Sequence, residues 1–268
     1  MKIFRHLLRL VILAIFVAPF YVKDFPWFRG TFDGSTIIVG DWKIYLADPF
    51  TALSLCLSSM TMAQELVIGA ITVFVFYLLL KPRIFCSWVC PVNMLMEFGR
   101  GSSMKIQKTD KNPKLKYFVF AGFLIVSFVT GIAIWVPLNP LSALVRGLQY
   151  KLVYVVLFVL LLVLLESYTK KYFFCKNICP IGTFYALFNK MFGVFHIEVH
   201  NACSGCLKCT VDCMAHDDLV SSIGKAKKGN ENILVRSSDC TLCGNCTNSC
   251  ESSDISIVKR FPILKRSN

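Results

Sequence analysis

The sequence predicts a mainly α-helical protein that combines a membrane domain of four helices with a small cysteine-rich domain. Two observations lead to this prediction. Of the 268 residues, 55% are apolar, more than a soluble domain of this length usually contains. Eight of the 13 cysteines lie after residue 200. We therefore divide the chain into a membrane domain, residues 1–194, and a C-terminal domain, residues 195–268.

Four apolar segments are the predicted membrane-spanning helices. They cover residues 7–22, 64–80, 117–136 and 152–168. Each approaches the 17–25 residues that cross a hydrocarbon core of about 30 Å, and the first is the shortest. The first segment follows Lys2 and Arg5, as the apolar part of a signal peptide would, but no small-residue cleavage site follows it. We therefore expect an uncleaved anchor.

Lysine and arginine predict the orientation of these segments. Basic residues gather at the N-terminus, after the second segment and after the fourth, and such residues favour the cytoplasmic side. Both termini and the cysteine-rich domain are therefore expected in the cytoplasm. The basic residues that carry this prediction are Lys2, Arg5, Arg9, Lys81, Arg83, Arg100, Lys105, Lys108, Lys111, Lys114, Lys116, Lys170 and Lys171.

Composition and motifs also exclude some classes of function. The net charge of +13 flanks the apolar segments and forms no separate basic domain, so we expect no nucleic-acid partner. The chain contains no C-x-x-C-H run for c-type haem. It also lacks the glycine-rich runs that bind dinucleotides or nucleoside triphosphates.

The C-terminal cysteines form two runs with identical spacing, C-x2-C-x2-C-x3-C, which is typical of bacterial ferredoxin [4Fe–4S] sites. In such pairs the fourth cysteine of one run ligates the cluster of the other run. We therefore predict two clusters. The cluster-1 site consists of Cys203, Cys206, Cys209 and Cys250, and the cluster-2 site consists of Cys240, Cys243, Cys246 and Cys213.

A zinc site or a disulfide framework is the alternative explanation of these cysteines. Zinc needs only four ligands, and its sites usually join two C-x2-C units across a longer gap, so two full runs favour clusters. One departure from the ferredoxin pattern is that Met214 and Glu251 stand where proline usually follows the fourth cysteine. The fold expected for residues 195–268 is therefore ferredoxin-like, with an unusual turn after each run.

A second repeat lies after the second and fourth apolar segments. The first Cys-Pro motif, Phe85–Val92, and the second, Phe174–Ile181, both read F-C-x3-C-P-[VI]. Proline suits the first turn of a new helix, so each motif should lead into an amphipathic helix on the membrane surface. The motif cysteines could together hold a metal or cluster, exchange a disulfide, or be structural thiols only. They are Cys86, Cys90, Cys175 and Cys179.

These motifs resemble the NapH family of ferredoxin-type membrane proteins, within the wider NapH/MauN/NosR-like class. The resemblance rests on the run Cys86–Asn93, the run Leu46–Phe50, the second Cys-Pro motif, the four apolar segments and the two C-terminal cysteine runs. It covers nearly the whole chain. It implies an iron–sulfur electron-transfer protein of the bacterial inner membrane that serves as the membrane subunit of a quinol dehydrogenase.

The resemblance also implies the substrate and partners. The electron donor would be menaquinol or ubiquinol. The partners would be a periplasmic iron–sulfur subunit of the NapG kind and a cytochrome that leads to a periplasmic nitrate reductase. Nothing in composition or spacing indicates nitrate.

A quinol site needs apolar walls, aromatic residues and a proton acceptor, and Glu65 is the acceptor that the sequence suggests. It begins the second apolar segment, and a carboxylate inside a membrane is costly and usually functional. The alternative is an interfacial carboxylate that caps the start of the helix.

Two other functions fit the same motifs. One is a polyferredoxin that reduces metal during the assembly of another enzyme. The other is a redox-sensing membrane protein without enzymatic activity. Reduction of the clusters by a quinol would separate the favoured function from both.

Overall fold

The computed structural model describes residues 2–21, 28–31, 36–39, 42–45, 47–59, 64–100, 114–169 and 172–260. Some residues used above lie outside the described part of the chain, and nothing is said of their structure. They are Leu46, Lys105, Lys108, Lys111, Lys170 and Lys171.

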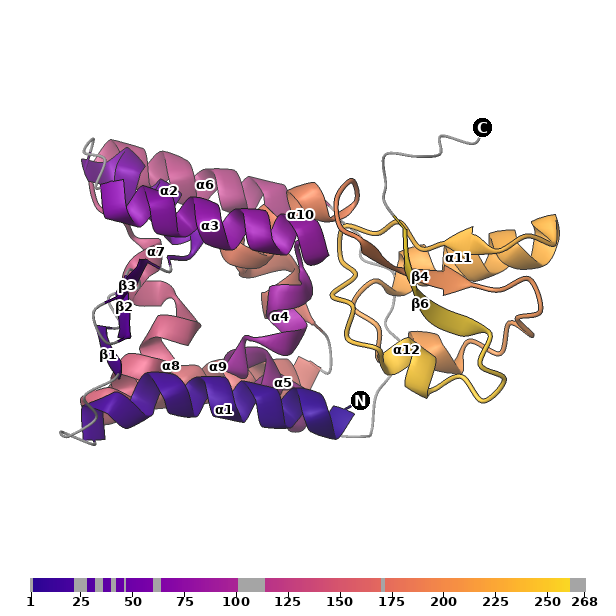
Figure 1. Cartoon of the computed structure of the whole chain (residues 1–268), viewed down its shortest axis with the longest axis horizontal. Helices are drawn as coiled ribbons and strands as arrows, with labels where there is room; N and C mark the ends of the chain where they lie inside the picture. Colours follow the sequence, from indigo (N-terminus) through magenta and orange to yellow (C-terminus); the bar gives the residue numbers. More distant parts are fainter. Residues whose placement is uncertain are drawn as a thin grey trace.

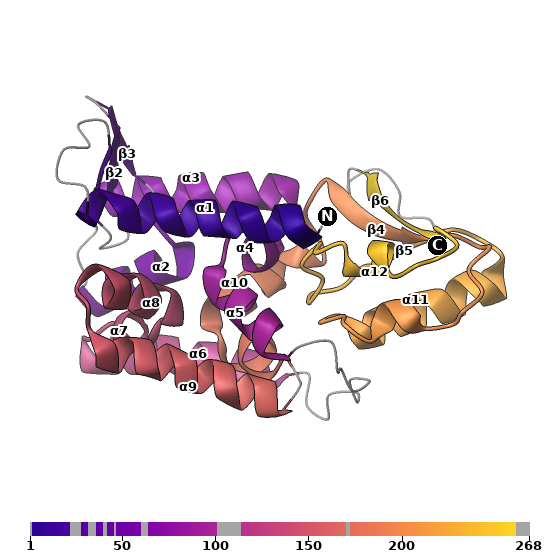
Figure 2. The same cartoon turned by 90° about the horizontal axis from the view of Figure 1, so that it is seen from below.

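Four long helices lie with their axes roughly aligned along the longest axis of the molecule (Figures 1 and 2). They occupy the four apolar segments and are α1 (Lys2–Tyr21), α3 (Gln64–Leu80), α6 (Leu115–Thr130) and α9 (Val153–Thr169). Among the described residues, no helix combines the length and the apolar character needed to cross a membrane. Helices α3 and α9 have 17 residues and α6 has 16, about 25 Å of helix, while the 20-residue α1 carries three basic residues.

Shorter helices connect the long ones in a repeated order. Helix α2 (Pro49–Ser59) lies between α1 and α3 in the first half of the bundle, and α7 (Trp135–Leu138) and α8 (Pro140–Gln149) lie between α6 and α9 in the second half. Helix α2 packs against α3 and α6, whereas α8 packs against α9 and α1. Each short helix therefore contacts the first long helix of the other half, which ties the two halves together.

The two Cys-Pro motifs have similar local structures. The first contains α4 (Ile84–Trp88) and leads into α5 (Pro91–Arg100), and the second contains the π-helical turn η1 (Phe174–Ile178) and leads into α10 (Pro180–Asn189). Both following helices begin at the motif proline, as predicted. That they lie on the membrane surface stays a prediction. Helix α5 packs against α1, α8 and α9, and α10 packs against α2 and α6, because both bury apolar side chains.

A small antiparallel sheet lies between α1 and α2. Its strands are β1 (Phe28–Thr31), β2 (Thr36–Val39) and β3 (Trp42–Tyr45), paired in the order β1-β2-β3. It lies at the end of the bundle far from the C-terminal domain (Figure 1). The Cys-Pro motifs lie toward the opposite end, where the first one contacts the C-terminal domain.

The C-terminal domain is a three-stranded antiparallel sheet with one main helix. The strands β4 (Phe195–Val199), β5 (Ile233–Leu234) and β6 (Ile255–Lys259) pair in the order β5-β4-β6. Between them lie η2 (Lys208–Thr210), α11 (His216–Gly229) and α12 (Asn245–Asn248). The sheet residues Ile197, Val199 and Ile255 form a core with Leu219 and Ile223 of α11. This domain abuts the end of the bundle where α1 begins and α3 ends (Figure 1).

Candidate functional site: two cluster sites and a central group of four thiols

Each cluster site predicted from the sequence is one cavity in the structure. Cys203, Cys206, Cys209 and Cys250 line a cavity of about 180 Å³ in the C-terminal domain. A second, smaller cavity is lined by Cys213, Cys240, Cys243 and Cys246. In both cavities the fourth cysteine comes from the other run, as the ferredoxin spacing predicts. Each set offers the four thiolates that one [4Fe–4S] cluster takes, and the cluster-2 cavity, at about 20 Å³, is much the smaller of the two.

The backbone of the two runs follows the same path. In the first run Gly205 and Leu207 have positive φ of 77° and 60°, and in the second run Leu242 and Gly244 have 52° and 73°. The left-handed positions therefore recur at the same two places. Such turns point successive N–H groups into one concavity, a device that many iron–sulfur sites use. Two leucines adopt this conformation despite its steric cost, which indicates that both loops need it.

The pKa values of Cys209 and Cys213 are raised by burial and by cysteines of their own predicted set. Burial, together with the neighbouring Cys203, Cys250 and Cys206, raises the pKa of Cys209 to about 11. Burial and the cluster-2 cysteines likewise raise the pKa of Cys213 well above its usual value. Thiolates crowded in a buried site repel one another, and bound iron would offset that repulsion.

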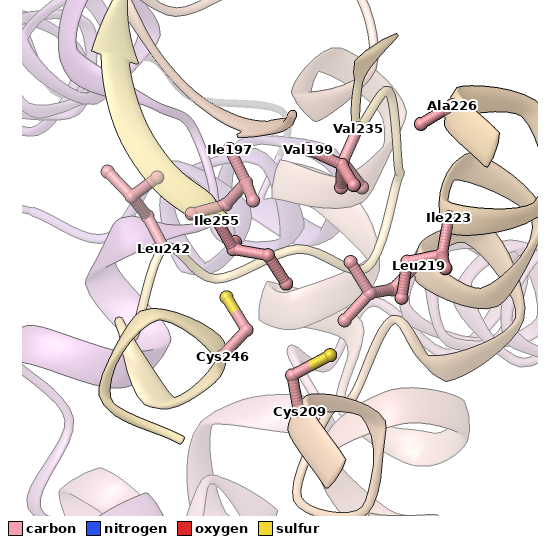
Figure 3. Close-up of a cluster of buried hydrophobic side chains, with 10 residues drawn as sticks. All are labelled: Ile197, Val199, Cys209, Leu219, Ile223, Ala226, Val235, Leu242, Cys246 and Ile255. Atoms are coloured by element: carbon pink, nitrogen blue, oxygen red, sulfur yellow. The ribbon is translucent and has the colours of Figure 1, made fainter. Parts of the chain in front are cut away.

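Apolar packing holds the two cluster sites together. Cys209 and Cys246 are buried in the core of the C-terminal domain with residues of the sheet and of α11 (Figure 3). Their side chains both point toward this core (Figure 3). Cys209 is also among the neighbours that raise the pKa of Cys246, after burial and the cysteines of its own set. The two sites therefore lie close enough to share electrostatic effects.

The residues that replace the usual prolines have different surroundings. Met214 is buried beside the cluster-2 cavity. Glu251 is exposed, and its carboxylate accepts a hydrogen bond from Lys208 Nζ at 2.8 Å. This contact joins the end of the second run to the middle of the first.

The four cysteines of the Cys-Pro motifs lie near one another at the end of the bundle that adjoins the C-terminal domain. We call them the central thiol group. Burial raises the pKa of Cys175, and Glu166, Cys179, Cys90 and Cys86 raise it further. Burial and the neighbouring thiols also raise the pKa of Cys90 to about 11 and that of Cys179 to about 12. Each motif contributes two thiols, so neither half of the bundle completes this group alone.

Glu166 borders the central thiol group from α9. Its side chain is 3% exposed, and its Oε2 accepts a hydrogen bond from the backbone N–H of Phe174 at 3.0 Å. Glu166 therefore fixes the start of the second Cys-Pro motif.

The first Cys-Pro motif touches the cluster-2 loop directly. Ser87 Oγ donates to the carbonyl of Thr241 at 2.5 Å, and Trp88 Nε1 donates to the carbonyl of Leu242 at 3.0 Å. Asn189, at the end of α10, donates to the carbonyl of Cys240 at 2.7 Å. The cluster-2 site is thus held against the central thiol group, and the cluster-1 site lies farther along the same domain.

Five of the basic residues that predicted the orientation are buried at this interface. Arg5 Nη1 donates to the carbonyl of Cys243 at 2.7 Å, and Arg83 forms an ion pair with Asp239. Burial alone would raise the pKa of Asp239, but Arg83 and Lys116 hold it below its usual value. The side chains that predicted the orientation are thus held inside the protein, by acidic side chains, loop carbonyls and, for Lys81, His196. The five are Arg5, Arg9, Lys81, Arg83 and Lys116.

An apolar cavity of about 470 Å³ adjoins the first Cys-Pro motif. Phe85, Val89 and Pro91 of that motif form part of its wall. Asp48 also lines it, which the sequence interpretation missed, although its position before Pro49 marks it as a helix cap. Glu65, the proton acceptor suggested by the sequence, is exposed in the first turn of α3 and does not line this cavity.

A separate question is whether one metal ion could bind among these groups. In the described part of the chain, no set of three or more histidine, cysteine or acidic side chains could hold a metal ion. The two four-cysteine sets of the C-terminal domain line cavities. A four-iron cluster requires this arrangement, since each iron takes its own thiolate.

Comparison with known proteins supports the iron–sulfur interpretation. The 4Fe-4S binding domain family Fer4_5 matches residues 62–109 and 152–199. Each matched region contains one Cys-Pro motif, and both end before the ferredoxin runs. The family match therefore falls on the central thiol group, whereas the ferredoxin spacing identifies the C-terminal sites. No solved structure matches the chain.

Full-length relatives identify the family. The chain is 30% identical to the ferredoxin-type protein NapH of Haemophilus influenzae over 264 residues, which cover 96% of this chain and 89% of that protein. It is 26% identical to NapH of Escherichia coli, covering 97% and 89%. It is 29% identical to the methylamine utilization ferredoxin-type protein MauN of Paracoccus denitrificans, covering 79% and 74%. The chain therefore belongs to the NapH/MauN family of ferredoxin-type iron–sulfur electron-transfer proteins.

Proposed function

We propose that this protein is the membrane subunit of a quinol dehydrogenase, which takes electrons from menaquinol or ubiquinol and passes them through iron–sulfur clusters to a partner protein. The central thiol group carries this proposal. It lies between the apolar cavity, which borders the first Cys-Pro motif, and the cluster-2 loop, which is hydrogen-bonded to the same motif. A lipid-soluble donor in the cavity would therefore be close to a chain of redox centres.

The four cysteines of the central thiol group would hold a further iron–sulfur centre in this proposal. The 4Fe-4S family match over both motifs supports it, as does the electrostatic effect of the other three thiols on Cys175. Cys203, Cys206, Cys209 and Cys250 would hold one C-terminal cluster, and Cys240, Cys243, Cys246 and Cys213 the other. The clusters supply one-electron acceptors, while the chain supplies their ligands and shields them from water.

The membrane location is part of the proposal, and outward apolar side chains support it. Large apolar residues are exposed along all four long helices, and an apolar surface of this extent usually meets lipid or another protein. Examples are Leu7, Ile71, Phe128 and Leu161. The N-terminus of α1 contacts the C-terminal domain, which agrees with placing both termini on one side. By resemblance, that side is the cytoplasmic face of the bacterial inner membrane.

The electron acceptor is the part of the proposal that depends most on the relatives. The resemblance to NapH implies a periplasmic iron–sulfur partner, a cytochrome and a nitrate reductase. MauN proteins of similar identity are named for methylamine utilization. Growth of a deletion strain on nitrate and on methylamine, with and without the restored gene, would separate the two acceptor systems.

The test uses the full-length chain, purified anaerobically in detergent. We expect at least the eight irons of the two C-terminal clusters, and more if the central thiol group holds a cluster. Added menaquinol or ubiquinol should produce the EPR signal of reduced clusters. The proposal is wrong if dithionite reduces the clusters but neither quinol does. Reaction with metal ions and not with quinol would instead support a metal-reducing assembly protein.

A further inference from the structure

The apolar cavity lies where the two halves of the bundle meet, and an internal repeat frames it. Asp48-Pro49-Phe50-Thr51-Ala52-Leu53 begins α2, and Asn139-Pro140-Leu141-Ser142-Ala143-Leu144 begins α8. Both runs read [DN]-P-[FL]-[ST]-A-L. The first and fourth residues of both runs line the cavity. Two equivalent helix starts therefore face one ligand-sized space.

Both helix starts are capped by the residue before proline. Asp48 Oδ2 accepts a hydrogen bond from the Thr51 N–H at 2.8 Å, and Asn139 Oδ1 accepts one from the Leu141 N–H at 3.0 Å. The remaining polar groups at these ends include Thr51 Oγ1, which is buried without a hydrogen-bond partner among the described residues. Helix N-termini favour oxygen atoms that carry negative charge. The cavity thus offers polar groups at two points of an otherwise apolar wall.

The cavity also has a side that a lipid-soluble molecule could enter. Its lining includes Ile12 and Phe16 of α1 and Thr72 and Phe76 of α3. Phe76 is 56% exposed, so the wall between these two helices continues onto the apolar outer surface. A volume of about 470 Å³ falls in the range of small-ligand pockets. The geometry suits a flat apolar ring that carries an oxygen at each end.

We propose that this cavity binds the quinol head group between the starts of α2 and α8, and that Asp48 is the catalytic base that accepts the quinol protons. This inference rests on the function proposed above. Asp48 is the one carboxylate among the described residues that line the cavity.

A quinol loses two protons and two electrons when it becomes a quinone. The Asp48 carboxylate accepts the proton of one hydroxyl as its O–H bond breaks, and one electron passes to an oxidised iron–sulfur cluster. Asp48 then releases this proton to water and accepts the second, while the second electron passes to another cluster. The products are one quinone, two protons in water and two clusters reduced by one electron each.

The state of Asp48 agrees with this role. Burial raises its pKa to about 6, against hydrogen bonds from Thr51 and Phe50 that lower it. A base with a pKa near neutrality can both accept and release a proton. The other ionisable groups around it are Tyr77, Tyr185 and Arg146 in the cavity wall, and Cys86 of the central thiol group.

The first test measures binding of oxidised menadione to the full-length protein by equilibrium dialysis, with no reductant present. Thr72→Trp places an indole at the mouth of the cavity and should weaken binding at least about tenfold, since it fills the ligand's space. Ile68→Trp is the matched control, one turn earlier on α3, exposed and outside the cavity. Equal binding by wild type and Thr72→Trp would overturn the proposed site.

The second test measures how fast menadiol reduces the clusters. Asp48→Asn should keep its fold, because Asn139 already caps the equivalent helix, and should bind menadione normally. Its reduction by menadiol should be about 100-fold slower, as is usual when a general base is lost. Reduction by dithionite should be unchanged. A normal rate in Asp48→Asn, or a slowed rate in Glu65→Gln alone, would overturn the role of Asp48. If menadiol and longer quinols all fail to reduce the wild-type clusters, the proposed function itself is wrong.

Discussion

In the first half of the helical bundle the short helix is capped by an aspartate, and in the second half the equivalent helix is capped by an asparagine. The same contrast recurs at the Cys-Pro motifs. Three residues before the first cysteine stands Arg83 in the first half and Tyr172 in the second. The halves therefore share a backbone plan, while the carboxylate among the described residues of the cavity wall belongs to the first half.

Each half also binds the cluster-2 site in an equivalent way. Arg83 contacts Asp239, directly before Cys240, and the Tyr172 hydroxyl donates to Asp212, directly before Cys213. The comparison teaches that a repeated scaffold can assign different tasks to its halves. Both halves hold the cluster domain and both supply thiols. Only the first presents a carboxylate to the cavity.

The largest expected effect tests what the halves share. Cys90→Ala removes a thiol of the first half, and Cys179→Ala removes one of the second. Because the central thiol group takes two thiols from each half, each substitution should reduce quinol-dependent cluster reduction to background. The eight irons of the C-terminal domain should remain, as measured by iron analysis and EPR.

The double variant Cys90→Ala, Cys179→Ala provides the decisive contrast. If it keeps full quinol-linked activity, the Cys-Pro cysteines are structural. If only one of the single variants loses activity, the thiols of the two halves do not act as one group.

The next effect concerns the contacts with the cluster-2 site. Arg83→Met removes one ion-pair partner of the buried Asp239, keeps the ion pair with Lys116, and should destabilise the protein by about 3 kcal/mol. Tyr172→Phe should cost only about 1 kcal/mol, because Asp212 keeps its hydrogen bond from Asn245 Nδ2 at 2.8 Å. Urea titrations followed by cluster absorbance measure both values. Equal losses would show that the buried charge of the first half adds nothing.

The pH dependence of quinol-driven cluster reduction distinguishes the aspartate cap of α2 from the asparagine cap of α8. Since the pKa of Asp48 is raised to about 6, the carboxylate is protonated below that pH and cannot accept a quinol proton. The rate of quinol-driven cluster reduction should therefore rise with pH up to about 6, roughly tenfold per unit below the midpoint. Asp48→Asn should remove this dependence. A wild-type profile that is flat between pH 5 and 7 would contradict the assignment.

The smallest effect compares the caps as structural elements. Asn139→Ala should cost about 1 kcal/mol through the lost hydrogen bond at the start of α8. Asp48→Ala should cost less at pH 8, because removal of the buried carboxylate offsets part of the lost cap. As the pH falls from about 6 toward 4, Asp48 in the folded protein takes up a proton before the unfolded chain does and this offset shrinks, so the two costs should begin to converge. Urea titrations at pH 8 and pH 5.5 measure the difference.

Much of the chemistry could be predicted from local spacing. The runs that begin at Cys203 and Cys240 predict cluster ligands, because three cysteines three residues apart can surround one cluster in a short loop. Pro91 and Pro180 likewise mark helix starts, because their fixed φ suits a first helical turn. The partners Cys250 and Cys213 could be assigned because ferredoxin runs exchange their fourth cysteines.

Other features could not be predicted, because they depend on contacts between distant segments. Arg5 and Arg83 were interpreted as charges beside membrane spans, since nothing near them in the sequence shows the carbonyl of Cys243 or the carboxylate of Asp239. Glu65 was suggested as the proton acceptor because it is a carboxylate at the edge of an apolar segment. Asp48 did not, because its part in a cavity becomes visible only when α1, α3 and α8 pack around it.

The sequence by itself determined the helical class, the two four-cysteine sets and the repeat of the Cys-Pro motifs, because each depends on residues that are close together in the sequence. The tertiary structure decided where those parts meet. Packing of α5 and α10 inside the bundle brings four thiols from two distant segments together. The cross-packing of α2 on α6 and of α8 on α1 brings two helix starts to one cavity. Burial then turns ordinary basic residues into the ion pairs and hydrogen bonds that hold the cluster domain in place.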